Sequence, residues 1–147
     1  MDFEQLAFIE KWRQRAARGV VVALDGRRGD LLVTMRVGDL GARLDLRGRD
    51  ASGAARRARL AIGDRVTMAI EYRATDVSAG SGQEVSGGLV AAGATVEGIV
   101  ATAGDVVEVD CGAPVLVDGG TLPGVKPGDA VRFTVADEGT AYLIPTR

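Results

Sequence analysis

Residues 60–70 read LAIGDRVTMAI, and residues 125–135 read VKPGDAVRFTV. In both stretches a Gly-Asp pair precedes a segment in which apolar side chains alternate with other residues. Each stretch therefore predicts a tight turn followed by a β-strand with one buried face. The side chains predicted to face inward are Val66, Met68, Ile70, Val131, Phe133 and Val135.

Gly-Asp pairs before apolar segments recur elsewhere in the chain. Gly29-Asp30 and Gly104-Asp105 precede further apolar segments, and residues 40–47 alternate between apolar and other side chains. Strands separated by glycine-rich turns at about eight to twelve residues are typical of small barrels and sandwiches. The sequence thus predicts an all-β fold made of tandem small OB- or SH3-like β-barrels with an N-terminal α-helix. One larger barrel or sandwich, with Gly-Asp turns that recur by chance, is the alternative.

These patterns predict four segments. Residues 1–18 are expected to form the helix, in which Asp2 can act as the N-cap and Phe8, Ile9, Trp12 and Ala16 form one apolar stripe. Residues 19–77 are expected to form a first, basic barrel and residues 93–147 a second, acidic one. Between them, residues 78–92 are rich in Gly and Ser, which predicts a linker or a long loop.

Composition excludes several classes of function. The chain has 147 residues, of which 46% are hydrophobic, with one cysteine and no histidine. Catalytic Ser-His and Cys-His pairs and the common zinc ligand sets all require histidine or several cysteines. We therefore expect no enzyme activity, no catalytic residue, no metal and no cofactor. Cys111 alone cannot form an internal disulfide, which fits a cytoplasmic location, and no apolar run is long enough to span a membrane.

Charge is the one functional clue. Residues 1–74 hold 15 Lys and Arg against 10 Asp and Glu, whereas residues 75–147 hold 3 against 10. Guanidinium groups bind phosphates through two parallel hydrogen bonds, so an arginine-rich loop on a small barrel predicts binding of single-stranded nucleic acid or another polyanion. The predicted anion-binding residues are Arg43, Arg47, Arg49, Arg56, Arg57 and Arg59.

Two other functions fit the same charges. The basic barrel of one copy could dock on the acidic barrel of the next, or on a protein partner, which would make the chain an interaction or self-assembly module and a homo-oligomer. A small ligand or oxyanion could instead bind at a subunit interface.

The second half resembles the small β-barrels known as TOBE or Mop-like domains, which are related to the OB-fold. The resemblance covers residues 96–144 and rests on EGIV at 97–100, VVEVD at 106–110, VKPGDAVRF at 125–133 and YLIP at 142–145. It implies a five-strand barrel that serves as a regulatory part of transport ATPases or as a molybdate-binding oligomer. The Ser-Ala-Arg-Asn opening of the molybdate binders is absent. Residues 43–52 also share an arginine pair and an Asp-Ala-Ser segment with PilZ domains, which bind cyclic dinucleotides.

Overall fold

The computed structural model describes residues 16–27, 29–37 and 44–144, together with Phe3, Leu6, Ala7, Glu10 and Arg13. The strands are β1 (Ala17–Arg27), β2 (Asp30–Val37), β3 (Leu44–Asp50), β4 (Arg65–Tyr72), β5 (Ala74–Ala79), β6 (Glu84–Val85), β7 (Leu89–Val90), β8 (Thr95–Thr102), β9 (Val106–Asp110), β10 (Pro114–Asp118), β11 (Ala130–Val135) and β12 (Gly139–Leu143). The helical segments are η1 (Ala51–Gly53), α2 (Ala54–Arg57), η2 (Ser86–Gly88) and η3 (Gly119–Thr121). The predicted all-β class is confirmed.

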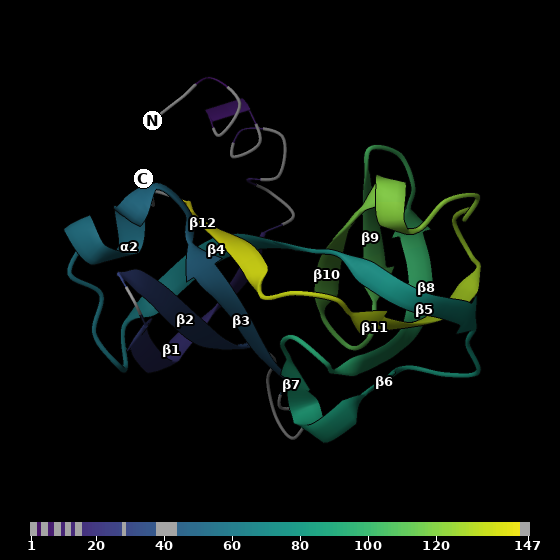
Figure 1. The fold of residues 1–147 in the computed structure, drawn as a ribbon, viewed down its shortest axis with the longest axis horizontal. Coiled ribbons are helices and arrows are strands. Elements are labelled where there is room, and N and C mark those ends of the chain that lie inside the picture. Colours follow the sequence, from purple (N-terminus) through teal and green to yellow (C-terminus); the bar gives the residue numbers. More distant parts are fainter. Residues whose placement is uncertain are drawn as a thin grey trace.

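Five strands form a closed ring, which we call the first lobe. Its order is β1-β2-β3-β12-β4, and β4 pairs again with β1. The pairs are antiparallel except that β12 runs parallel to β3. Figure 1 shows this ring on the left, with α2 at its outer end.

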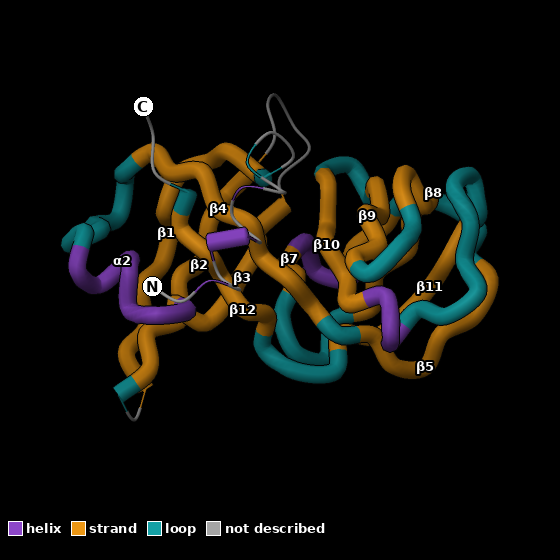
Figure 2. The backbone as a smooth tube through the Cα atoms, turned by 90° about the horizontal axis from the view of Figure 1, so that it is seen from above, coloured by secondary structure: helices purple, strands orange, loops and turns teal. Residues whose placement is uncertain are grey.

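The second lobe contains β5, β6, β8, β9, β10 and β11 and lies beside the first (Figures 1 and 2). Here β8 pairs with β9 and β11, β9 pairs with β10, and β11 pairs with β5. Only Arg73 separates β4 from β5, so one extended run passes from the first lobe into the second. In the opposite direction, β12 follows β11 and returns to the first lobe, where it pairs with β3 and β4.

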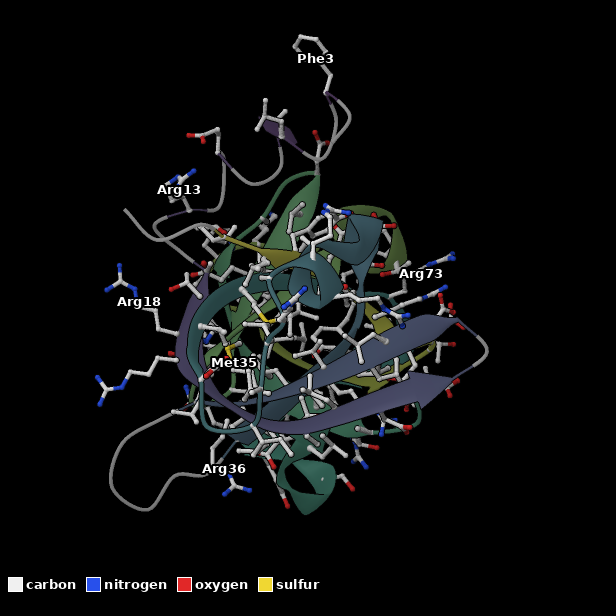
Figure 3. All side chains as sticks on the ribbon, turned by 90° about the vertical axis from the view of Figure 1, so that its left-hand side faces the viewer. Phe3, Arg13, Arg18, Met35, Arg36 and Arg73 are labelled. Carbon is white, nitrogen blue, oxygen red and sulfur yellow. The ribbon has the colours of Figure 1, made fainter. Side chains whose placement is uncertain are left out.

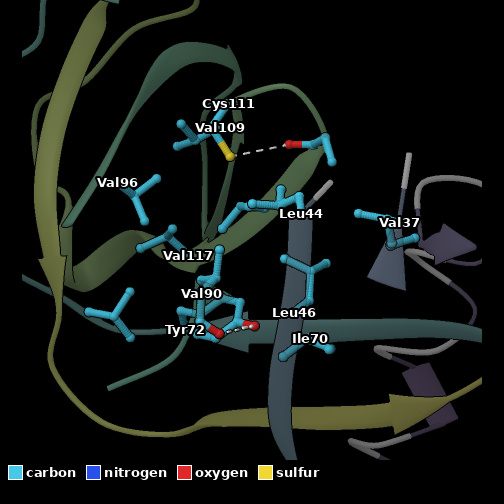
Figure 4. Close-up of a cluster of buried hydrophobic side chains, with 14 of the residues drawn as sticks. Val37, Leu44, Leu46, Ile70, Tyr72, Val90, Val96, Val109, Cys111 and Val117 are labelled. Carbon is cyan, nitrogen blue, oxygen red and sulfur yellow. Dashed lines mark hydrogen bonds between the residues drawn. The ribbon is translucent and has the colours of Figure 1, made fainter. Parts of the chain in front are cut away.

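A single hydrophobic cluster extends through both lobes. The six side chains predicted to face inward are all buried, from Phe133 at 0% exposed to Val66 at 6%, so the predicted strand registers are confirmed. Within the cluster the hydroxyl of Tyr72 donates to the carbonyl of Arg47 (2.9 Å). The same hydroxyl lies 3.3 Å from the carbonyl of Val90, a residue labelled beside it in Figure 4. A buried hydroxyl needs such partners to offset the loss of water.

The predicted N-terminal helix lies largely outside the described residues. Its last two positions, Ala17 and Arg18, belong to β1, so the prediction is wrong there. Of the earlier residues, Phe3 is 89% exposed and Leu6 is 48% exposed. The pairing of Ala17 with Met68 explains the early start of β1, because tertiary hydrogen bonds in the ring outweigh local helix propensity. Within the described residues, no helix combines the length and apolar content needed to cross a bilayer.

Residues 78–92 are not a bare connection. They contain β6, which pairs with β8, and β7, which pairs with β3, so this segment contacts both lobes. The strand pairings also cross the predicted boundary at residue 93, since β12 completes the first lobe. Ala69, which lies between two of the predicted inward-facing residues, is itself buried with Leu116 and Ile144 in a second, small cluster.

Candidate functional site

The structure separates the predicted arginine cluster into three parts. Arg43 lies outside the described residues. Arg47 and Arg49 lie on β3, and Arg56, Arg57 and Arg59 lie on α2 or just after it. Residues of one cluster in the sequence therefore have different surroundings.

Arg47 is committed to an ion pair. Its Nε donates to Oε2 of Glu138 (3.0 Å) and its Nη2 donates to Oε1 of the same carboxylate. This hydrogen bonding raises the pKa of Arg47, against a smaller lowering by burial. The pair ties β3 to the turn that leads into β12. A guanidinium engaged in both of its hydrogen-bonding directions is a poor site for a phosphate, so Arg47 has a structural role.

The arginines of α2 are exposed but ordered. The carboxylate of Asp50 accepts from the backbone N–H groups of Ala55 (2.9 Å) and Arg56 (3.1 Å), which fixes the start of this short helix. Nη2 of Arg56 donates to the carbonyl of Gly29 (3.4 Å). The expected flexible loop is thus replaced by a capped turn of helix. Polyanion binding by Arg56, Arg57 and Arg59 stays a prediction.

Arg49 lies in a cleft between the two lobes, which we call the inter-lobe cleft. Its volume is about 550 Å³. That size is within the range of small-ligand sites. Both lobes contribute to its walls: Asp30, Leu32, Arg49, Glu71, Arg73, Asp118, Asp137, Glu138 and Thr140.

Strand register places three of these side chains in a row. Arg49 on β3 is opposite Thr140 on β12, and Thr140 is opposite Glu71 on β4. Directly opposed residues of neighbouring strands carry their side chains on the same face of the sheet, about 5 Å apart. A guanidinium, a hydroxyl and a carboxylate therefore line one wall of the cleft.

Within the described part of the chain, the guanidinium of Arg49 has no hydrogen-bond or ion-pair partner. Arg73 has only a distant one, Asp137, at 4.0 Å, and both side chains are more than half exposed. The carboxylates are more constrained: Glu138 is held by Arg47, and Oδ1 of Asp118 accepts from the N–H of Gly120 (3.0 Å). The two arginines are thus the positively charged hydrogen-bond donors available in the cleft.

Of the cleft residues, the sequence indicated only Arg49. The others come from six separate elements, and only the return of β12 to the first lobe brings Thr140 and Glu138 beside β3. No local pattern in the sequence carries that information.

Other reactive groups are poorly placed for chemistry. Cys111 is buried, and burial raises its pKa to about 11, so it remains a neutral thiol near pH 7. Among the residues that the structure describes, no group of three or more Cys, Asp or Glu side chains could hold a metal ion.

No family model and no curated protein matches the chain. A solved structure is similar to it with a TM-score of 0.48 and 20% identity, over 88% of this chain and 95% of the other. That structure is of ModG, a cytoplasmic molybdate-binding protein, with molybdate bound. This likeness does not assign a ligand to the chain.

Proposed function

We propose that the protein is a non-catalytic binding module that holds a small ligand, by an oxyanionic group, in the inter-lobe cleft. The observation that supports this most directly is the guanidinium of Arg49, which has no partner among the described residues and lies in a cleft of about 550 Å³. A guanidinium offers a planar fork of N–H donors that matches a carboxylate or another oxyanion. Thr140 adds a hydroxyl beside it, and Arg73 adds a second positive charge.

The carboxylates of the cleft limit the choice of ligand. Five acidic residues line it against two arginines. A free dianion would be repelled by this surplus of negative charge, whereas a ligand that also carries a positive group would be attracted by it. We therefore propose a small zwitterion, such as an α-amino acid, rather than a simple oxyanion.

Isothermal titration calorimetry tests the proposal. The panel contains amino acids, simple amines, sulfate and molybdate, the last because TOBE or Mop-like domains include molybdate binders. Zwitterions are expected to bind the wild type, and the Arg49→Ala variant should bind about 10–100-fold more weakly, the effect of losing a charged hydrogen bond. Arg59→Ala is the matched control, since Arg59 is exposed outside the cleft.

Equal binding by Arg49→Ala and the wild type would refute the site. Binding of molybdate and sulfate but not of amino acids would keep the site and refute the zwitterion. If no member of the panel binds, the cleft is not a small-ligand site of this class.

We further propose that the chain is a tandem repeat of one five-strand unit. The support is a shared hydrogen-bond pattern. The backbone of Val21 donates to Asp64 (2.9 Å) and accepts from Gly63 (2.8 Å). The backbone of Val100 makes the same two bonds, at the same distances, with Asp129 and Gly128.

Glycines at matching positions add to this support. A Cβ added at Gly19 would lie 2.1 Å from the carbonyl oxygen of Arg36, and one at Gly98 would lie 2.5 Å from that of Asp110. The strands correspond as β1 to β8, β2 to β9, β3 to β10, β4 to β11 and β5 to β12. Because β5 pairs with β11 and β12 pairs with β4, each unit gives its last strand to the other.

A further inference from the structure

The outward face of the first lobe is basic around an apolar centre. Val20 on β1 lies opposite Arg36 on β2 and Arg65 on β4, and Arg18 is two residues away on the same face. Val20 is 37% exposed, and Ile62, in the turn before β4, is 68% exposed. We call Arg18, Val20, Arg36, Ile62 and Arg65 the basic face. Figure 3 shows Arg18 and Arg36 extending outward from the ring while Met35 points inside.

Two of these arginines have no ion-pair partner among the residues that the structure describes. Arg36 forms an ion pair with Asp45 (2.9 Å). Arg18 and Arg65 are exposed, and neither contacts an acidic group among the residues described here. Their charges are therefore available to another molecule.

The corresponding face of the second lobe has the opposite charge. In the proposed repeat, where shared hydrogen bonds relate Val21 to Val100, Glu97 takes the position of Arg18 and Ile99 that of Val20. Asp110, which lies opposite Ile99, takes the position of Arg36. Glu84 on β6 lies opposite Glu97 and adds another carboxylate. We call Glu84, Glu97, Ile99 and Asp110 the acidic face.

The acidic face is also hollowed. A depression of about 370 Å³ is lined by Glu84, Ser86, Gly87, Thr95, Glu97 and Arg132. Arg132 is the one basic residue of this lining, so carboxylates remain in excess. A depression with two glutamates can receive an arginine side chain from outside.

We propose that these two faces bind each other between copies of this chain, the acidic face of one copy on the basic face of the next. The partner is a second copy because one chain carries both faces on corresponding strands, with opposite charges at two matched pairs of positions. Apolar residues at the centre of each face, Val20 and Ile99, are flanked by charges, which is the arrangement of protein interfaces. This surface shares no residue with the inter-lobe cleft.

The contact joins different faces, so it is heterologous and generates a closed ring or an open chain rather than a two-fold dimer. Exposed ion pairs are individually weak and are screened by salt. Assembly is therefore expected at low salt and at high protein concentration, and it should diminish as salt increases.

Charge reversal provides the test, by sedimentation velocity on the full chain at about 0.02 M and 0.5 M salt. The first variant, Arg18→Glu/Arg65→Glu, makes both faces acidic, and the second, Glu84→Arg/Glu97→Arg, makes both faces basic. Each variant alone should be monomeric at low salt, where the wild type assembles. An equimolar mixture of the two should assemble again, since each acidic face then meets a basic one.

The control is Arg56→Glu/Arg59→Glu, which changes the net charge as much as the first variant does but outside the basic face. It should assemble like the wild type. Circular dichroism verifies that each variant is folded, and Arg18→Gln/Arg65→Gln replaces the first variant if it is not. A wild type that is monomeric at low salt, or a mixture of folded variants that fails to assemble, would overturn the proposal.

Discussion

Replacing Phe133 by alanine tests the packing of the second lobe. Phe133 is 0% exposed and lies opposite Val96 on β8. Removing its ring from a buried site loses about 2 kcal/mol of transfer free energy. A residual cavity of about 80 Å³ adds about 2 kcal/mol, at roughly 24 cal/mol per Å³. We therefore expect the free energy of unfolding to fall by about 4 kcal/mol.

Urea unfolding followed by circular dichroism measures this loss. With a slope of about 2 kcal/mol per M, the midpoint should fall by about 2 M. The control is Arg132→Ala, the exposed neighbour on the same strand, which should change stability by less than about 0.5 kcal/mol. A loss below about 1 kcal/mol for Phe133→Ala would refute the packing described here. It would mean that the cavity does not persist or that Phe133 is not buried, as after a one-residue slip of β11, which would place its buried side chains on the exposed face.

Three further predictions concern other parts of the chain. If the arginines of α2 and its turn bind single-stranded DNA or RNA, the triple change of Arg56, Arg57 and Arg59 to alanine should lower the salt dependence of binding by up to about three units in a filter-binding assay; no binding by the wild type at low salt would remove that function. Because burial raises the pKa of Cys111 to about 11, the unfolded thiol ionises first, so the free energy of unfolding should fall by about 2 kcal/mol between pH 9 and 11. The Cys111→Ala variant should lack this fall in the free energy of unfolding. If the variant shows the same pH dependence as the wild type, the fall does not come from Cys111. Gly98→Ala should cost about 1–3 kcal/mol in urea unfolding, since the added Cβ would lie 2.5 Å from the carbonyl oxygen of Asp110; an unchanged midpoint would show that β9 can move aside.

The sequence predicted local structure well and long-range pairing poorly. Alternation after Gly63-Asp64 and Gly128-Asp129 identified β4 and β11 with their buried faces, because register follows the apolar period directly. It could not indicate that β12 joins the first lobe, since an isolated strand pattern does not specify a partner. The burial of Ala69 was missed for the same reason, as it depends on Leu116 and Ile144 from distant segments.

The candidate site shows the same division. Arginine content drew attention to Arg47 and Arg49, which are two residues apart on one strand. Their surroundings differ because Glu138, far along the sequence, pairs with Arg47, whereas Arg49 has no partner within the described ranges. The different surroundings of Arg47 and Arg49 follow from the tertiary structure. The sequence alone indicated only the charge imbalance between the two halves of the chain.

The return of β12 to the first lobe has a consequence for synthesis on the ribosome. The first ring includes residues 139–143, so it cannot close while only the N-terminal half has emerged. Until then, β3 and β4 lack their shared neighbour and leave unpaired edges, which favour aggregation. Pairing strands so far apart in the chain also slows folding. A nascent chain of this protein therefore stays prone to aggregation until residues 139–143 have emerged, and it should depend on chaperones more than a chain of two consecutive, self-contained barrels.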